Sequence, residues 1–145
     1  MNARCQCKAI TFQTPLPQPL QLYICHCTEC RHQSSSAFGI SAFFPYFEIP
    51  DPSGLIGCYT RPTLKGHQLE CLFCKNCGAR LLHRRKQYVP APGERPPEGA
   101  VVRVRGGCLE GLTKEMLDKA VHLWCKEAVV GIPAGAISWE EEPVE

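Results

Sequence analysis

Cysteine spacing is the feature that most constrains how this chain can fold. Seven of its eleven cysteines lie in three short groups, Cys5-x-Cys7, Cys25-x-Cys27-x-x-Cys30 and Cys74-x-x-Cys77. Such groups are typical of zinc sites, in which thiolates lie about 2.3 Å from the ion and four ligands close a structural site. One four-cysteine site would leave three thiolates, and a zinc ion with three protein ligands keeps a position open for chemistry. The count therefore predicts one structural and one reactive zinc ion.

Disulfide bonding is the other usual explanation of heavy cysteine use. The first residues, MNARCQCKAITFQ, contain no continuous apolar core and no small-residue cleavage site, so we expect no signal peptide. An odd number of cysteines also fits complete disulfide pairing poorly. We therefore predict metal binding in a reducing compartment, the cytoplasm or alternatively the nucleus.

Length and charge limit the classes of partner. The 145 residues suit a single domain over 1–145, and no stretch has the apolar length of a membrane span. The formal charge of +2 counts every cysteine as neutral, whereas two zinc ions would add four charges and seven thiolates would remove seven, leaving about −1. That is not the basic footprint of a nucleic-acid-binding protein, so we expect neither nucleic acid nor membrane as a partner.

The spread of 13 prolines and 12 glycines favours short strands and turns over long helices. We predict a mainly β chain with strands near residues 8–14, 20–24, 55–60, 67–73, 79–84 and 101–105. The last of these, VVRVR, alternates apolar and charged residues, which indicates a half-exposed strand. Residues 36–44 are apolar and we expect them to be buried, and residues 87–99 form the clearest loop.

One helix is predicted near the end of the chain, from Leu112 to about Lys119. Thr113 can cap it, and Glu115 favours its positively polarised start. The following AVHLWC can extend this helix or form a strand, and we favour the strand. In a strand His122 and Trp124 would share one face, where they would line the site or simply pack, and we favour packing for Trp124.

Two of the cysteine groups suit a closed site. Residues i and i+2 of a strand point to the same side, so Cys5 and Cys7 can present both sulfur atoms together. Cys74 and Cys77 form a knuckle, and the following Gly78 tolerates a left-handed backbone. These four cysteines would tie the start of the chain to its middle, although spacing alone does not settle which pair joins which.

The third group supplies three sulfur atoms within six residues, from Cys25, Cys27 and Cys30. His26 lies between two ligands and should point away. A second closed site completed by His32, His67 or Cys71 is the alternative. Three thiolates make a weaker Lewis acid toward water than three neutral histidines, and they suit a soft fourth ligand such as a substrate thiolate. The open site thus indicates chemistry at sulfur more than hydrolysis.

Several segments resemble one known family. CxC near the start, CHCTECR followed by SSSAFG, FCKNCGARL and VRVRGGCLEGL look like the glutathione-dependent formaldehyde-activating enzymes, a family that also includes centromere protein V-like proteins. The resemblance runs from Cys5 to about Leu112. It implies a β-tent fold of small antiparallel sheets and short helices. It also implies a structural zinc on Cys5, Cys7, Cys74 and Cys77, and a catalytic zinc on Cys25, Cys27 and Cys30. The family's named activity joins formaldehyde to glutathione, giving S-hydroxymethylglutathione, and is classed as a carbon–sulfur lyase.

The chain departs from the family pattern around the implied substrate pocket. Relatives often carry Ser-Gly where this chain has Ser34-Ser35, and their Gly-Ser-Leu-Asp-like segment reads Gly107-Cys108-Leu109-Glu110 here. Residues 87–99 look like an insertion, and the end of the chain also differs from bacterial members. These departures can reshape the pocket while leaving both metal sites intact.

An anionic tripeptide such as glutathione needs cations or backbone donors around it. Arg31 is the favoured cation because it adjoins Cys30, and Ser34 and Ser35 can donate hydrogen bonds or merely end a helical turn. Further basic residues lie near the knuckles, namely Arg61, Lys65, Arg80 and Arg84, and solvated surface is the default for each. We expect most of the other cysteines, Cys58, Cys71, Cys108 and Cys125, to be small buried hydrophobes.

These observations lead to one main hypothesis and two alternatives. We predict a zinc-dependent carbon–sulfur lyase-type enzyme acting on a glutathione, or other thiol, adduct of a small carbonyl compound. Glu29 or a histidine would move the proton. One alternative keeps the zinc and changes the reaction to lyase, dehydratase or isomerase chemistry on another small metabolite. The other is a non-catalytic, zinc-stabilised interaction module.

Overall fold

A computed structural model describes residues 1–143 of the chain. The strands are β1 (Asn2–Arg4), β2 (Thr11–Gln13), β3 (Gln21–Cys25), β4 (Gly39–Pro45), β5 (Ile56–Pro62), β6 (Gln68–Cys74), β7 (Arg80–Arg85), β8 (Val101–Arg105) and β9 (Val121–Leu123). The helices are α1 (Thr28–Ser34) and α2 (Lys114–Asp118), with three 3-10 turns, η1 (Lys86–Tyr88), η2 (Gly106–Cys108) and η3 (Cys125–Glu127). The prediction of a mainly β chain with short helices is confirmed.

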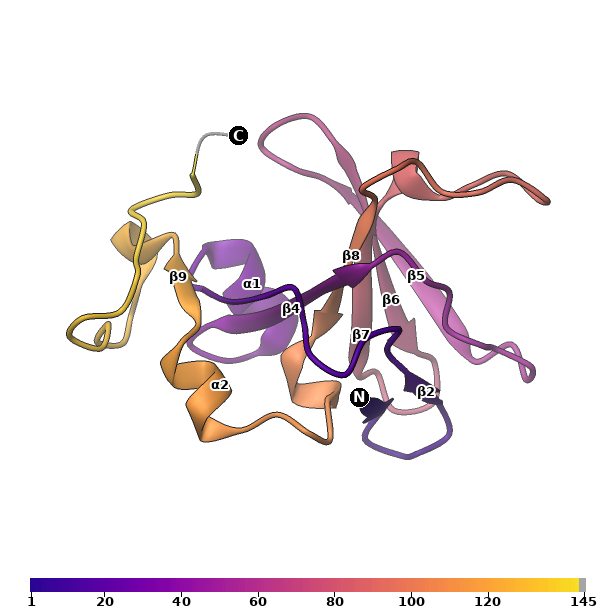
Figure 1. Ribbon diagram of the computed structural model, residues 1–145, viewed down its shortest axis with the longest axis horizontal. Helices are drawn as coiled ribbons and strands as arrows, with labels where there is room; N and C mark the ends of the chain where they lie inside the picture. The colour runs from indigo at the N-terminus through magenta and orange to yellow at the C-terminus, as the bar shows by residue number, and fades with distance from the viewer. Residues whose placement is uncertain (144–145) are drawn as a thin grey trace.

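The strands form a two-stranded sheet, β1–β2, and a seven-stranded sheet in the order β5-β6-β7-β8-β4-β3-β9. Neighbouring strands are antiparallel except for β3 and β9, which run parallel. Figure 1 shows β5 to β8 fanning out on one side of the molecule, while α1, α2 and β9 lie on the other. The end strand β9 comes from the last third of the chain, and sequence spacing gives no sign of this long-range parallel pairing.

Alternation along the strands separates a core face from a polar face. Val102 and Val104 of β8 are fully buried in the hydrophobic core beside Phe44 of β4. Because successive side chains of a strand point to opposite faces, Arg103 and Arg105 lie together on the other face of β8. The predicted alternation of VVRVR is therefore present, but Arg105 is buried rather than solvated.

The region around α2 largely follows the prediction. Thr113 precedes α2, and its Oγ1 accepts a hydrogen bond from the amide of Met116 at 3.3 Å. The favoured strand in AVHLWC exists as β9, but it ends at Leu123. Trp124 then adopts a left-handed backbone with φ of 58°, so it does not continue the alternation with His122.

The segment after η3 returns along β9. The amide of His122 donates to the carbonyl of Ile137, and the amide of Trp124 donates to the carbonyl of Glu141, both at 2.8 Å. This course leads toward the loop between β5 and β6, which Figure 1 shows at the top of the view. Lys65 of that loop forms an ion pair with Glu142 at 3.4 Å. Since β5 and β9 are the two edges of the seven-stranded sheet, this pair connects its opposite edges.

Within residues 1–143, no helix has both the length and the apolar character needed to cross a lipid bilayer.

Candidate metal centres and the adjoining cavity

The structure brings Cys5, Cys7, Cys74 and Cys77 into one cluster, with all four sulfur atoms within 4.8 Å of one another. The Sγ atoms of Cys5 and Cys7 are 3.5 Å apart, and those of Cys7 and Cys74 are 3.8 Å apart. Four thiolates placed tetrahedrally about 2.3 Å from an ion would be about 3.8 Å from each other. The donor set and its dimensions therefore fit a zinc ion held by sulfur alone.

The local backbone conformation and hydrogen bonds position the sulfur atoms of this four-sulfur cluster. After Cys77 the chain turns through Gly78, whose φ of 78° is the predicted left-handed conformation, and the Gly78 amide donates to the carbonyl of Cys74 at 2.7 Å. The amide of Ile10 donates to Sγ of Cys5 at 3.3 Å. Hydrogen bonds, first from the Asn76 side chain, lower the pKa of Cys7 to about 6, which favours the thiolate that a metal requires.

The second cluster consists of Cys25, Cys27 and Cys30, whose sulfur atoms also lie within 4.8 Å of one another. Cys25 is the last residue of β3, Cys27 is the N-cap of α1, and Cys30 lies in the first turn of that helix. Sγ of Cys27 accepts a hydrogen bond from the Cys30 amide at 3.3 Å. The strand-to-helix turn thus places three sulfur atoms on one side of the chain.

The three proposed additional ligands do not join this cluster. Across the described part of the chain, neither His32, His67 nor Cys71 is grouped with the three sulfur atoms. His26, between two of the cysteines, is buried, and its Nε2 lies 3.0 Å from Nδ1 of His122. Residues 1–143 therefore offer the three-sulfur cluster no fourth ligand, which fits a zinc ion with one position open.

The three-sulfur cluster opens into a cavity of about 360 Å³, which we call the cysteine cavity. Its apolar wall includes Phe43, Leu69, Leu123 and Trp124. Its polar lining combines three arginines and a histidine with three carboxylates, namely Arg61, Arg103, Arg105, His83, Glu29, Glu127 and Glu142. Trp124 was expected to pack, but the structure places it against this cavity. An open sulfur cluster in a partly apolar cavity that offers both guanidinium and carboxylate groups has the composition of a binding site for a small polar organic molecule.

Two of these arginines have no acidic partner among residues 1–143. Arg61 pairs with Glu29 at 3.7 Å, whereas Arg103 and Arg105 have no carboxylate within ion-pairing distance. Arg105 is only 6% exposed, and its Nη1 donates to Oγ of Ser41 at 2.7 Å. A buried guanidinium with a single neutral partner is costly unless another negative charge compensates it. The thiolate of Cys30 is one such charge, because hydrogen bonds from the neighbouring cysteines and then the positive charge of Arg105 lower the pKa of this thiol.

The thiols of the second cluster influence one another strongly. Hydrogen bonds from Cys25 and Cys27, followed by the positive charges of Arg105 and Arg61, lower the pKa of Cys30 to about 3. The same contacts, with Cys27 first, raise the pKa of Cys25. Negative charge is therefore held at Cys30, on the side of the cluster that faces the arginines.

His83 is a neutral side chain in the wall of the cysteine cavity. Burial, together with the positive charges of Arg105 and Arg80, holds its pKa well below the usual value. Nη1 of Arg80 lies 3.3 Å from Nε2 of His83, and an arginine can only donate. Nε2 is therefore the acceptor, and the proton of the imidazole lies on Nδ1.

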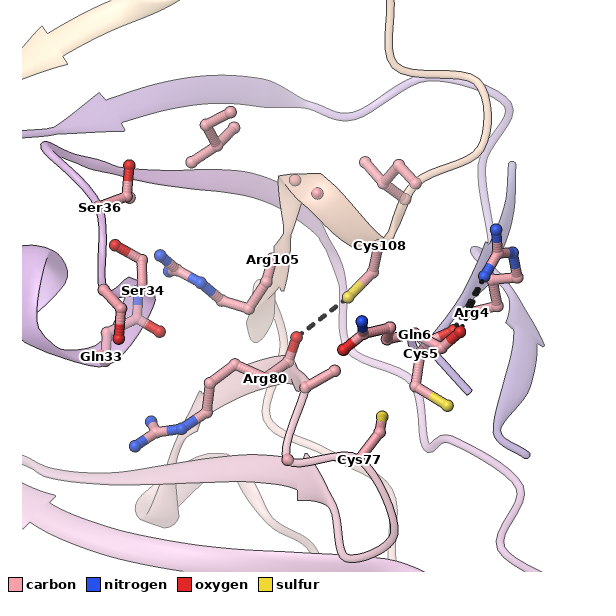
Figure 2. A pocket seen from close by; sticks show the side chains of 18 of the residues that line it. Arg4, Cys5, Gln6, Gln33, Ser34, Ser36, Cys77, Arg80, Arg105 and Cys108 are labelled. Atoms are coloured by element: carbon pink, nitrogen blue, oxygen red, sulfur yellow. Dashed lines mark hydrogen bonds between the residues drawn. The ribbon is translucent and has the colours of Figure 1, made fainter. Parts of the chain in front are cut away.

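A larger cavity of about 790 Å³ lies beyond Arg105, which lines both cavities. Figure 2 shows Cys5 and Cys77 at one end of it and Gln33, Ser34 and Ser36 at the other. Sγ of Cys108 donates to the carbonyl oxygen of Arg80 at 3.0 Å within this cavity. The smaller cavity is the candidate reaction site because it alone contains the three-sulfur cluster.

The residues favoured for substrate binding lie apart from the cysteine cavity. Arg31 lines neither cavity, and Ser34 and Ser35 line the larger one. Oγ of Ser34 donates to the carbonyl of Cys30 at 2.7 Å, and Ser35 ends α1 with φ of 51°. These contacts lie at the end of the helix, and a role of the two serines in substrate binding stays a prediction.

Sequence reasoning missed Arg103, Arg105 and Ser41 as parts of the site. The alternation in VVRVR was the available signal, because it placed both arginines on one face, but it could not show what covers that face. The remaining cysteines divide evenly: Cys71 and Cys108 are buried as expected, whereas Cys58 is exposed and Cys125 is half-buried.

Comparison with known proteins gives the family. A family model described as glutathione-dependent formaldehyde-activating enzyme matches residues 1–127. The chain belongs to this family. Both cysteine clusters lie inside the matched region, and each can hold a metal ion. Because the family is described as activating formaldehyde with glutathione, membership is consistent with an enzyme that acts on a thiol.

A solved structure shares the fold. The crystal structure of a Rhodobacter sphaeroides protein, a structural genomics target, aligns with 84% of this chain and 99% of its own, with a TM-score of 0.58 and 20% identity. At that identity the likeness describes the fold alone. No curated protein sequence matches this chain.

Proposed function

We propose that the protein is a zinc-dependent carbon–sulfur lyase-type enzyme that makes or breaks the adduct of a small aldehyde with an anionic thiol, glutathione being the first candidate. The observation that carries this proposal is the opening of the three-sulfur cluster into the cysteine cavity beside Arg103 and Arg105. Among residues 1–143, Arg103 and Arg105 have no ion-pair partner, and a cavity that combines them with soft sulfur ligands suits a substrate that carries both a thiol and carboxylates.

Each side chain then has a distinct task. Cys25, Cys27 and Cys30 would hold the metal, and zinc bound there would favour the thiolate form of a substrate thiol. Arg103 and Arg105 would bind the carboxylates of the thiol, because guanidinium groups form strong charge-assisted hydrogen bonds with carboxylates. The apolar wall with Trp124 would keep water away from the reacting carbon.

The reaction needs one proton movement. The thiolate sulfur forms a bond to the aldehyde carbon, the electron pair of the carbonyl moves to its oxygen, and that oxygen takes a proton. The reverse steps break the carbon–sulfur bond. Glu29 and His83 both line the cavity and are the candidates for moving this proton.

Cys27→Ser tests the proposal. Serine is a good N-cap, so α1 should survive the exchange, while the second metal site loses a ligand. We expect a folded protein that has lost about one zinc ion per chain and no longer accelerates exchange between ¹³C-formaldehyde and its glutathione adduct in NMR spectra. Wild-type protein that holds two zinc ions yet leaves this exchange at its spontaneous rate would refute the proposal.

A further inference from the structure

The segment that follows η3 supplies a charged residue to the cysteine cavity. The family model ends at residue 127, yet residues 137–141 are held along β9 and η3 by backbone hydrogen bonds. Two of them run from the amide of Cys125 to the carbonyl of Trp139, at 3.0 Å, and from the amide of Trp139 to the carbonyl of His122, at 2.9 Å. This attachment places Glu142 in the lining of the cavity.

Glu142 already contacts an ammonium group at this position. Its carboxylate pairs with Nζ of Lys65 at 3.4 Å, and both side chains are about two-fifths exposed, at 40% and 42%. Ion pairs of such exposure contribute little to stability. The Lys65 ammonium can therefore be exchanged for an ammonium group from a ligand at small cost.

Arg103, a cation that can bind a carboxylate, lines the same cavity. Arg103 has no carboxylate within ion-pairing distance in residues 1–143, and its guanidinium lies over the ring of Phe43, 5.2 Å from the centroid. Burial and the nearby charge of Arg85 lower the pKa of Arg103, and the negative charge of Glu142 acts in the opposite direction. The anion and the cation thus interact electrostatically, and both line the cysteine cavity.

We propose that Glu142 and Arg103 together recognise the zwitterionic α-amino-acid group of the thiol substrate, with Glu142 contacting the ammonium and Arg103 the carboxylate. The proposal rests on the proposed function, since it assigns the substrate class of the same cavity. An α-amino acid carries both charges on one carbon, and a site that offers one carboxylate and one guanidinium matches that pattern. Glu142 is therefore a specificity-determining residue that lies outside the matched family region.

The test compares two ligands on zinc-loaded protein. Glutathione carries the α-ammonium group, and N-acetylglutathione keeps the thiol and both carboxylates but lacks that charge. Isothermal titration calorimetry should show wild-type protein binding glutathione about tenfold more tightly, as expected for one hydrogen bond between charged groups. In Glu142→Gln this preference should fall to about twofold or less.

Glu141→Gln is the matched control. Glu141 precedes Glu142, pairs with Lys126 and does not line the cavity, so its exchange should leave the tenfold preference intact. Lys65→Met is the complementary variant, because it removes the ammonium that competes for Glu142, and the preference for glutathione should rise. A fall in Lys65→Met would show that the ion pair itself shapes the cavity, which overturns the proposal.

Two results separate this inference from the proposed function. Equal binding of both ligands by wild-type protein, or an unchanged preference in Glu142→Gln, would overturn the role of Glu142 while leaving thiol binding in place. Absence of binding for both thiols would refute the proposed function and this inference with it. Far-ultraviolet circular dichroism and zinc content verify that each variant is folded and loaded.

Discussion

Arg105 and Ser41 are cross-strand partners on β8 and β4, and the guanidinium of Arg105 donates to the Ser41 hydroxyl across the pair at 2.7 Å. This contact holds a buried positive charge between the three-sulfur cluster and the larger cavity, since Arg105 lines both cavities. Arg105 is thus placed to compensate thiolate charge and to receive a substrate carboxylate.

Replacing Arg105 should weaken substrate binding more than folding. In Arg105→Met we expect KM for an anionic thiol to rise by about ten- to a hundredfold, the usual range for losing a hydrogen bond from a charged group. Steady-state kinetics with glutathione measures this change. Arg95→Met, in an exposed loop, is the control and should leave KM unchanged. An unchanged KM in Arg105→Met would show that Arg105 serves only the cysteine cluster.

A methyl group at Gly39 should displace Arg105. A Cβ atom there would lie 2.4 Å from Nη2 of Arg105 and 3.2 Å from Cβ of Cys30. Because the guanidinium is the far end of a flexible side chain, it can move, and Gly39→Ala should fold while its KM for glutathione rises several-fold. Gly107→Ala is the matched control, since a Cβ at Gly107 meets open space. Equal kinetics in the two variants would contradict this view of Arg105.

The cysteine spacing predicted both sulfur clusters because the cysteines within each group are close together in sequence. A knuckle such as Cys74-x-x-Cys77 is determined by one turn and its glycine, and both are visible in a few residues. The arginines that line the cysteine cavity were harder to predict. Arg31 adjoins Cys30 in sequence but lines neither cavity, whereas Arg103 and Arg105 reach the cysteine cavity through the pairing of β8 with β4. Such long-range pairing leaves no local signal.

The contact between the two edges of the large sheet was also not predictable from local sequence. Alternation and turn residues correctly indicated β5, β6 and β9 as strands. Nothing in their local sequence indicates that the β5–β6 loop and the segment after β9 meet through Lys65 and Glu142. The meeting depends on the curvature of all seven strands and on backbone hydrogen bonds between β9 and residues far along the chain.

Loss of the four-sulfur cluster should unfold the protein. Structural zinc contributes on the order of 10 kcal/mol in zinc-finger peptides, which is comparable with the whole stability of a domain. We therefore expect Cys74→Ser to lose its cooperative thermal transition, in contrast to Cys27→Ser, which should keep one. Differential scanning calorimetry on both variants gives the comparison. A cooperative transition in Cys74→Ser near the wild-type temperature would rule out a structural role.

Acid should destabilise the protein through His83. The pKa of His83 is held below its usual value in the folded state, so protons bind the unfolded chain more readily. Its contribution to stability is present above about pH 6.5 and is lost as the pH falls below that value, with a slope of up to about 1.4 kcal/mol per pH unit. Urea unfolding between pH 7.5 and 5.5 should therefore show a smaller loss in His83→Gln than in wild type. Zinc content is followed in parallel, and equal losses in the two proteins would exclude His83 as the cause.

The two cysteine clusters also differ in when they can be completed. The reactive trio is contained within six residues and is available as soon as Cys30 leaves the ribosome. The other cluster closes only after Cys77 emerges, since Cys7 and Cys74 are 67 positions apart. During synthesis a metal ion can therefore meet Cys25, Cys27 and Cys30 well before all four cysteines of the other cluster are present.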